Sequence, residues 1–320
     1  MKVQHDFMWA MLVHLGTNMW YEPWDKGHEA YTQLWEIPGS YEMRLDKAVW
    51  DRYMEYLKAS GVNTLVIDLG DGIIYDSHPE LAIKGSWTKA EMKKELNKLN
   101  DMGFEVIPKL NFSSCHDAWM KEYSRMLSTP TYYKVCEDLI NEVCELFDYP
   151  RYFHIGFDEE DYETQKNYSY VVVRQNELWW SDLLKIISAV EKNNARAIMW
   201  SDYMRHHPDE YIEKCPKSVV TCNWYYNNNF YTGRTEGDEI RLYPFELLEK
   251  NGFDQFPGGS MNYENDNFKN LTEYCSNIIS KEHFKGMLQT TWTMVTEEWW
   301  EPLKLAADLL AETRKSFENK

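Results

Sequence analysis

The stretch VNTLVIDLG, residues 62–70, is apolar and β-branched without a break, which is typical of a strand buried on both faces of a parallel sheet. An amphipathic segment that ends at Gly61 precedes it, and this glycine is a suitable helix stop. After the strand, Thr88 and Glu91 have the spacing of a capping box that begins a second helix. A second apolar run, FEVIPKLNF at 104–112, follows. This part of the chain therefore predicts strands that alternate with helices.

The same alternation continues in both directions to the ends of the chain. Eight apolar runs, each followed by an amphipathic segment, are found at residues 8–16, 62–70, 104–112, 152–160, 196–202, 218–226, 253–259 and 286–293. Eight strand-then-helix units predict an α/β fold, a single (β/α)8 TIM barrel. No stretch rich in Pro, Gly and Ser divides the chain, so we expect one domain over residues 1–320.

Composition narrows the class of partner. The chain has 34 Lys and Arg against 52 Asp and Glu, a formal net charge of −18. A chain this acidic repels phosphate backbones and anionic membrane surfaces, so we expect neither nucleic acid nor a membrane as partner. No apolar run approaches the roughly 20 residues of a membrane-spanning helix. The sequence gives no indication of oligomeric state.

The short motifs of metal and cofactor sites are missing from the sequence. The six cysteines form no CxxC pair, and no GxGxxG or GxxxxGK[ST] follows a predicted strand. The first predicted strand offers only His14, where metal-dependent barrels of the amidohydrolase type need an HxH pair. We therefore expect no cofactor and no metal. His5 and Asp6 interrupt any signal-like start, which indicates a cytoplasmic protein unless an export signal was trimmed from the sequence.

In barrels of this kind the functional site lies where the strands end at their carboxyl termini. The chemistry-bearing residues at or near the predicted strand ends are His14, Asp71, Asn111, Asp158, Glu159, Asp202, Trp224 and Trp292. The fourth strand end is the richest, with four acids in a row at residues 158–161. Such a run has two interpretations: a carboxylate site in the mouth of the barrel, or a solvated loop that caps the next helix.

Carboxylates surrounded by aromatic rings suit the cleavage of glycosidic bonds. One carboxyl, kept protonated by apolar surroundings, protonates the leaving oxygen, and another stabilises positive charge at the anomeric carbon. The chain contains 14 Trp and 22 Tyr, and flat aromatic faces stack on sugar rings. The aromatics at predicted strand ends that could wall a sugar pocket are Trp200, Trp224, Tyr225, Tyr226 and Trp292. Core packing is the alternative role for each of them.

These motifs resemble one known family. The segment FHIGFDEE, residues 153–160, resembles the His-x-Gly-Gly-Asp-Glu signature of glycoside hydrolase family 20, the β-N-acetylhexosaminidases. VIPKLNFSSCH, residues 106–116, is similar to that family's Val-Ile-Pro-Glu-Ile-Asp-Met-Pro-Gly-His. The loop 69–88, with HPEL inside it, MWSD at 199–202 and QTTWT at 289–293 also fit. The resemblance covers most of the chain and implies one catalytic domain without the family's usual N-terminal accessory domain.

The resemblance implies a carbohydrate substrate and a substrate-assisted retaining mechanism on a terminal β-linked N-acetylhexosamine, GlcNAc or GalNAc. The substrate's own 2-acetamido oxygen attacks the anomeric carbon. Asp158 orients the acetamido group and stabilises the oxazolinium, and Glu159 is the general acid and then the base. Tyr225 or Tyr226 bonds the acetamido oxygen. Trp200, Trp224 and Trp292 line the pocket.

Several positions depart from the family pattern. The second signature glycine is Phe157, which we expect to add bulk beside the acids, and the third-strand aspartate is Asn111. The family's histidine is Cys115 or, shifted by one, His116. The first strand lacks the arginine that grips sugar hydroxyls, and the loop after the second strand lacks the expected Trp-Arg pair. The last strand has methionine where the family often has a sugar-binding glutamate, for which Glu297 or Glu298 could substitute.

These departures leave two alternatives beside the hexosaminidase hypothesis. One is a catalytically altered barrel that binds sugar without cleaving it. The other is a glycosidase of different sugar specificity, in which Glu159 acts with Asp202 or Asp71 as the partner carboxylate. Substrates without the 2-acetamido group distinguish the latter, because only that enzyme would hydrolyse them.

Overall fold

A computed structural model describes residues 2–22, 37–166, 168–169, 171–261 and 265–319. Its main sheet has eight strands, all paired in parallel, in the order β8-β7-β6-β5-β2-β1-β10-β9. The eight strands are β1 (Met8–His14), β2 (Thr64–Asp68), β5 (Glu105–Lys109), β6 (Tyr152–His154), β7 (Arg196–Trp200), β8 (Val220–Cys222), β9 (Gly258–Ser260) and β10 (Gly286–Thr290). Each lies within, or within one residue of, a predicted apolar run.

The first and last strands of this order also meet, which closes the sheet. Trp224 forms a parallel bridge to Gly258, and Thr221 forms one to Gln255. The amides of Phe256 and Gly258 donate to the carbonyls of Thr221 (2.9 Å) and Asn223 (2.8 Å). The structure therefore confirms the predicted (β/α)8 barrel. Pro257, which has no N–H to donate, separates the bridged residue 255 from β9.

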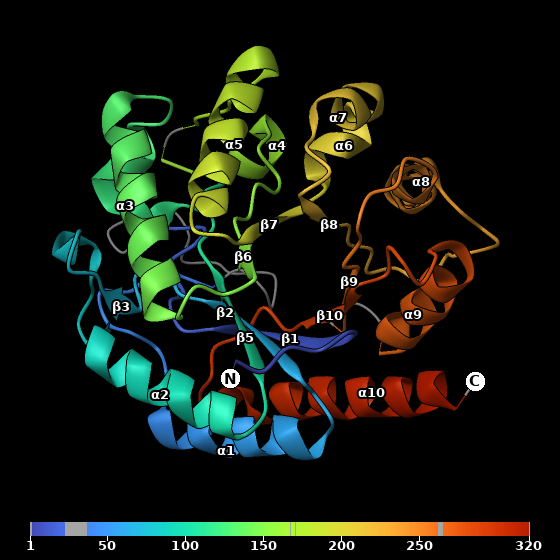
Figure 1. The fold of residues 1–320 in the computed structure, drawn as a ribbon, viewed down its shortest axis with the longest axis horizontal. Coiled ribbons are helices and arrows are strands. Elements are labelled where there is room, and N and C mark those ends of the chain that lie inside the picture. Colours follow the sequence, from blue (N-terminus) through green and yellow to red (C-terminus); the bar gives the residue numbers. More distant parts are fainter. Residues whose placement is uncertain (1, 23–36, 167, 170, 262–264, 320) are drawn as a thin grey trace.

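Helices surround the barrel on its outside (Figure 1). The long helices are α1 (Lys47–Ala59), α2 (Lys89–Asp101), α3 (Pro130–Leu146), α5 (Asn176–Glu191), α8 (Glu236–Lys250), α9 (Asn267–Ile278) and α10 (Trp300–Glu318). Short elements in the connections are β3 (Ile73–Ile74), β4 (Trp87–Thr88), α4 (Tyr162–Gln165), α6 (Asp202–His206), α7 (Pro208–Lys214) and the 3-10 turns Pro79–Leu81, Ala118–Arg125 and Glu297–Trp299. Among the described residues, no helix is long and apolar enough to cross a membrane.

Local sequence signals explain the helix boundaries. Thr88 accepts from the amide of Glu91, and the Glu91 side chain accepts from the Thr88 amide, so the predicted capping box is confirmed. The amphipathic pattern after the run at 218–226 predicts a helix only from about residue 242, but α8 begins at Glu236. A second capping box, between Thr235 and Asp238, begins that helix earlier, and Pro244 is accommodated inside it.

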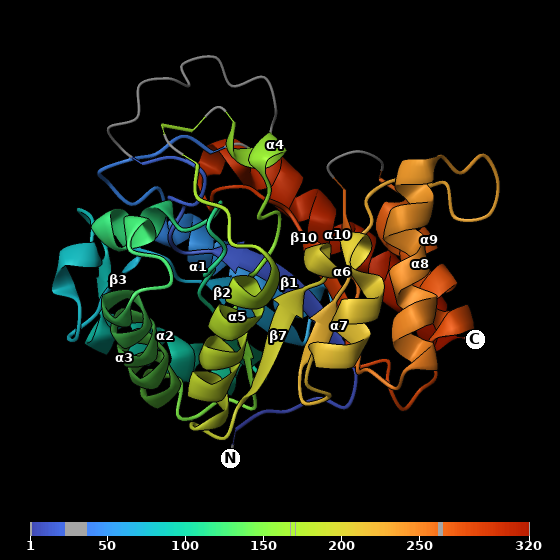
Figure 2. The same cartoon turned by 90° about the horizontal axis from the view of Figure 1, so that it is seen from above.

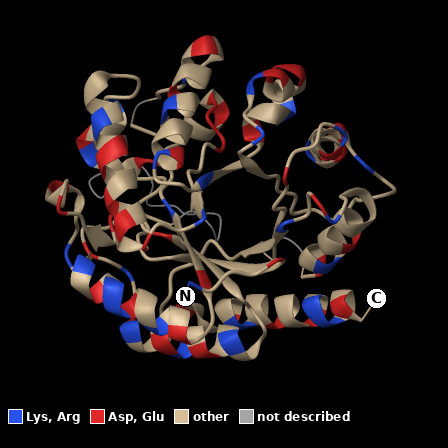
Figure 3. Cartoon of the chain, in the orientation of Figure 1, with Lys and Arg blue, Asp and Glu red and all other residues tan. Residues whose placement is uncertain are grey.

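Side chains alternate between two cores along each strand. In β1, Met8, Ala10 and Leu12 fill the barrel interior, whereas Trp9 and Met11 pack in the layer between the barrel and its helices. The charged residues lie mostly on the outer helices, with both signs interspersed (Figure 3).

The last inward-facing side chain of each strand lies at the carboxyl end of the barrel, which we call the mouth. Figure 2 shows α4 at this end, opposite the N-terminus.

Candidate active site

The loop after β6 carries the acid pair, and its backbone is unusually tight. Gly156 has φ +76°, and a β-carbon there would lie 1.8 Å from Asn111 Oδ1, so only glycine allows this approach. Phe157 and Glu159 also have positive φ, +66° and +52°. Non-glycine residues in this region store strain, which is typical of functional sites. The turn brings Asn111 Nδ2 to 3.0 Å from Asp158 Oδ1.

Phe157 does not add bulk beside the acids, contrary to the expectation from the sequence. Its ring is buried and packs edge-on against Trp179 of α5, with centroids 5.7 Å apart. The guanidinium of Arg174 lies 4.7 Å from the centre of the same ring. The positive φ turns this side chain into the outer layer, where it anchors the loop.

The four acids of residues 158–161 divide into two pairs. Glu160 is ion-paired with the buried Arg174 and accepts from the Ser114 amide at 2.9 Å. Asp161 caps α4 by accepting from the Thr164 amide at 2.8 Å. The capping interpretation therefore holds for Asp161, and Glu160 is structural. Asp158 and Glu159 remain for chemistry.

His116 links these two carboxyls. Its Nδ1 lies 3.2 Å from Asp158 Oδ1, and its Nε2 lies 3.5 Å from Glu159 Oε2. Burial lowers the pKa of His116, but the charge and hydrogen bond of Asp158 together with the charge of Glu159 outweigh this effect and raise it to about 9. The imidazole is thus a cation between two acids. Of the two candidates for the family's histidine, the structure brings His116 between the acids, while the Cys115 thiol contacts the backbone oxygens of Asp158 and Glu159.

The surroundings of Asp158 and Glu159 give these two carboxyl groups different pKa values. Burial would raise the pKa of Asp158, yet the charge and hydrogen bond of His116, with help from Lys109 and Asn111, hold it well below its usual range. For Glu159 the balance is opposite: burial and the nearby Asp202 and Asp158 carboxylates raise its pKa to about 7. Its side chain still keeps 39% of its surface exposed. One neighbouring acid is thus ionised, and the other is able to carry a proton near neutral pH.

A third carboxyl, Asp202, lies beside Glu159 and is held by two partners. Arg205 Nη1 donates to Asp202 Oδ1 at 2.8 Å, and Trp224 Nε1 donates to Asp202 Oδ2 at 3.0 Å. The Arg205 guanidinium also lies 4.0 Å from the centre of the Trp224 ring. Burial raises the pKa of Asp202, and Arg205 opposes this rise. The pair with Arg205 leaves Asp202 less free than Glu159 to move a proton.

Aromatic rings form a connected wall beside the acids. Trp200 and Trp292 have centroids 6.1 Å apart, and His14 lies 5.6 Å from Trp292. Tyr226 packs 4.8 Å from Trp224, and its hydroxyl accepts from Trp292 Nε1 at 3.2 Å. Four of the five predicted wall residues, Trp200, Trp224, Tyr226 and Trp292, therefore come together at the mouth, with His14 beside them.

Three predicted residues lie apart from this group. The Tyr225 hydroxyl is turned into the core and donates to Asp238 Oδ1 at 2.8 Å. Asp71 is buried and accepts from Asn18 Nδ2 at 2.6 Å, and burial raises its pKa to about 7. Glu298 lines a separate hollow of about 510 Å³ with Arg44 and Met294. None of the contacts of Asp71 or Glu298 in the described part of the chain reaches Glu159.

Sequence reasoning missed two basic residues of the mouth. Lys109 is fully buried at the end of β5 and pairs with Asp68. Arg205 holds Asp202. The i,i+3 spacing of Asp202 and Arg205 on a short helix was a usable signal. For Lys109 the signal was its position, at the inward parity of a strand that is otherwise apolar.

The mouth offers one group with metal-ligand atom types. His116, Asp158 and Glu159 each place one such atom within 4.8 Å of the others. Metal binding requires a deprotonated ring nitrogen, whereas the two carboxyls favour the protonated imidazole. We interpret the cluster as an ion-paired proton relay, and the expected lack of a metal and of a cofactor stays a prediction.

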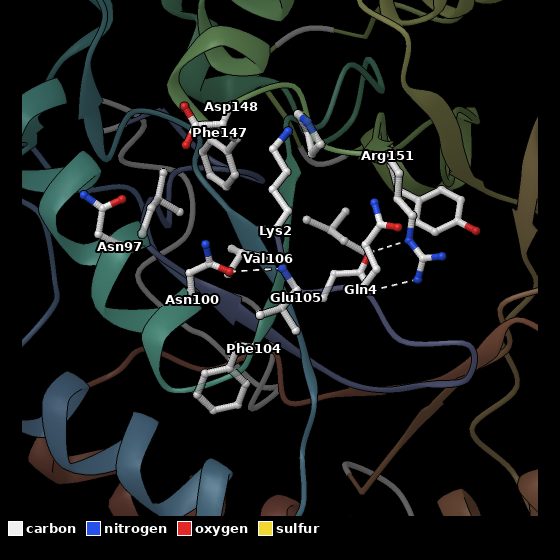
Figure 4. A pocket seen from close by; sticks show the side chains of 15 residues that line it. Lys2, Gln4, Asn97, Asn100, Phe104, Glu105, Val106, Phe147, Asp148 and Arg151 are labelled. Atoms are coloured by element: carbon white, nitrogen blue, oxygen red, sulfur yellow. Dashed lines mark hydrogen bonds and ion pairs between the residues drawn. The ribbon is translucent and has the colours of Figure 1, made fainter.

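The opposite end of the barrel, which we call the base, has a different character. A cavity of about 50 Å³ lies there between the N-terminal residues, α2 and the starts of β5 and β6 (Figure 4). Arg151 Nε and Nη2 donate to the two Glu105 carboxylate oxygens at 2.5 and 2.8 Å. Arg151 also donates to the His5 carbonyl at 2.6 Å. The Arg151–Glu105 pair is thus fully engaged, as expected for a structural ion pair.

The protein combines a closed (β/α)8 barrel with two neighbouring acids of different pKa and an aromatic wall at the strand ends. These features are typical of the class of glycosidase barrels. Residues 109–301, more than half of the chain, match the profile of the glycosyl hydrolase family 20 catalytic domain. The chain belongs to glycosyl hydrolase family 20. No curated protein matches it in sequence.

Solved structures share the fold. The chain is 14% identical to a β-N-acetylhexosaminidase from Bacteroides fragilis with a TM-score of 0.61, covering 96% of this chain and 66% of that one. For the GH20 β-N-acetylhexosaminidase from Streptomyces coelicolor the identity is 14%, the TM-score 0.62 and the coverage 95% and 64%. For Dispersin B the values are 15%, 0.57, 84% and 95%. The chain thus spans about two thirds of the length of the first two proteins.

Proposed function

We propose that this protein is an exo-acting glycosidase that removes terminal β-linked N-acetylhexosamine by a substrate-assisted, retaining mechanism. Family membership supports the reaction class, and the named relatives include β-N-acetylhexosaminidases. The observation that carries the proposal is the asymmetry of the acid pair. One histidine contacts both carboxyls, yet the pKa of Asp158 is held low and that of Glu159 is raised to about 7.

The two acids have distinct roles in the first step. Glu159 gives its proton to the glycosidic oxygen as the bond to the anomeric carbon breaks. The substrate's acetamido oxygen forms a bond to that carbon, which yields a cationic oxazolinium. Asp158, ionised and fixed by Asn111 and His116, accepts from the acetamido N–H and stabilises the positive charge.

The second step reverses the proton transfer. Glu159, now a carboxylate, takes a proton from water as the water oxygen attacks the anomeric carbon. The bond to the acetamido oxygen breaks, and the sugar leaves with its original anomeric configuration. In this scheme Tyr226, whose hydroxyl lies among Trp224 and Trp292, donates to the acetamido oxygen.

A second candidate function rests on Asp202. After burial, its charge is one of the contributions that raise the pKa of Glu159. A glycosidase that uses Glu159 with Asp202 would need no acetamido group on the substrate. Its ion pair with Arg205 and hydrogen bond to Trp224 are arguments against Asp202 as a free nucleophile.

The test is hydrolysis of aryl β-glycosides with and without a 2-acetamido group by the wild type and Glu159→Gln. We expect cleavage of acetamido substrates only, with the β anomer as first product by NMR, and a loss of at least 10²-fold in the variant. Glu163→Gln, an exposed acid four residues along, is the matched control and should keep the wild-type rate. Cleavage of sugars without the acetamido group would instead support Asp202. Binding of sugars without turnover would contradict both.

A further inference from the structure

Four neighbouring strands of the barrel end in a row of buried polar side chains. The last residues of β1, β2, β5 and β6 are register neighbours: His14 lies beside Asp68, Asp68 beside Lys109, and Lys109 beside His154. All four are at most 1% exposed. Each follows an inward-facing core residue by two positions, so the row forms the polar floor of the mouth.

Lys109 is the exceptional member of this row. A fully buried lysine is rare, because removing its charge from water is costly unless a partner compensates. Its Nζ contacts Asp68 Oδ2, and His14 Nδ1 lies 3.7 Å from the same oxygen.

The floor is connected directly to the acid pair. Asn111 follows Lys109 by two positions and donates to Asp158, and Asp158 follows His154 on the same strand end. The positive charge of Lys109 helps to hold the pKa of Asp158 low and opposes the rise in the pKa of His116. It also adds to the effect of burial in lowering the pKa of His14 to about 3.

We propose that Lys109 is a positioning residue of the active site, a buried cation anchored by Asp68 in the polar floor that places positive charge beneath Asp158 and His116. This inference rests on the proposed function. A cation below the acid pair favours the carboxylate at Asp158, which must face a positively charged intermediate. It also leaves the transferable proton of the pair at Glu159.

Other groups act on the same cluster and set the background for the test. The titratable and charged groups that act on Asp158 or His116 from the surrounding elements include Asp68, Lys109, Cys115, Asp117, His154, Glu159, Asp202 and Cys222. Lys109 is the one lysine or arginine in this set. Replacing Lys109 therefore removes positive charge from beneath Asp158 and His116, whereas replacing Asp68 removes negative charge.

Two variants that break the same ion pair make the test. An electrostatic role predicts opposite effects: Lys109→Met removes a cation and should raise the pKa of His116 above about 9, whereas Asp68→Asn removes an anion and should lower it. The measurement is an NMR titration of the histidine Cε1–H signals between pH 6 and 11, with His116→Gln identifying the signal. A shift of about one pH unit corresponds to a tenfold change in proton affinity.

The matched control is Arg151→Met, which breaks the part-buried pair at the base and should leave the His116 titration unchanged. A purely structural role for Lys109 predicts that both variants at the floor move the His116 pKa in the same direction or not at all, and either result overturns the proposal. If Lys109→Met does not fold, the double variant Lys109→Met/Asp68→Asn, which leaves no unpaired charge, should give His116 a higher pKa than Asp68→Asn alone, and an equal pKa in these two variants overturns the proposal.

Turnover gives the second readout. In folded Lys109→Met we expect kcat on an aryl N-acetylglucosaminide to fall about tenfold or more with KM little changed, because the carboxylate at Asp158 stabilises the intermediate rather than the bound substrate. An unchanged kcat overturns the proposal. If the wild type hydrolyses no glycoside, the proposed function fails, while the titration still decides the role of Lys109.

Discussion

Each end of the barrel holds an ion pair with a buried acid, yet the two pairs are used differently. At the base, Arg151 and Glu105 use every available oxygen and two guanidinium nitrogens on each other and on the His5 backbone. At the mouth, His116 is shared between two acids, and buried polar atoms of His14, Trp200 and Arg205 have no hydrogen-bond partner within the described ranges. Saturated pairs contribute stability, whereas unsaturated groups are ready to bind a ligand and cost stability.

The Asp158→Asn variant is the most direct test of this difference between the two ends. The variant keeps the shape of the side chain and removes the negative charge that faces the oxazolinium. We expect kcat to fall by about 10²–10⁴-fold in hydrolysis of an aryl N-acetylglucosaminide. The melting temperature, measured by circular dichroism, should change little, because the wild-type site is not optimised for stability. A near-wild-type rate would exclude the substrate-assisted role of Asp158.

Glu105→Gln is the counterpart at the base. It leaves the Arg151 guanidinium with a neutral partner, and because the Arg151 side chain is 30% exposed the loss should cost about 1–3 kcal/mol, less than for a fully buried pair. We expect a lower denaturation midpoint in urea and an unchanged kcat for the folded enzyme. A loss of kcat at a temperature where the variant is fully folded would show that the two ends are coupled.

The fold could be predicted because it depends on local patterns. Continuous apolar runs, and signals such as the Thr88 capping box, repeat often enough to specify eight strand–helix units. A predicted helix boundary was wrong where a capping signal was overlooked, as with the Thr235 capping box that begins α8. The strand at residues 152–160 is regular only over β6, because Gly156 and Phe157 turn the chain out of the sheet.

The site could be predicted only as a set of positions. The sequence placed four acids at one strand end, but their division depends on partners far away in the chain, such as Arg174 for Glu160 and His116 for Asp158. Adjacent residues with identical chemistry also diverge: Tyr225 points to Asp238, and Tyr226 points to Trp292. Lys109 was overlooked because its one signal is its parity, two positions after the inward-facing Ile107, and its partner Asp68 lies on another strand.

The two tyrosines sharpen the comparison within one dipeptide. Tyr226→Phe removes a hydroxyl at the mouth, and we expect kcat/KM for acetamido substrates to fall about tenfold, with stability little changed. Tyr225→Phe removes a buried hydrogen bond to Asp238 and should cost about 1–2 kcal/mol with unchanged kinetics. Urea denaturation and steady-state kinetics on both variants decide it. If Tyr225→Phe is the variant that loses activity, Tyr225 rather than Tyr226 contacts the acetamido group.

The pH profile gives the smallest and finest test. Glu159 must be protonated to act as the acid, and its pKa is raised to about 7, so kcat/KM should fall as pH rises through about 7. Asp202→Asn removes a neighbouring negative charge that contributes to this rise. The fall in kcat/KM should therefore occur at lower pH in that variant. The Glu159 pKa should not return to its ordinary value, because burial and Asp158 still raise it. A limb that stays in place, or moves upward, would show that Asp202 does not act on the proton of Glu159. A limb near 9 in the wild type would assign the essential proton to His116 instead.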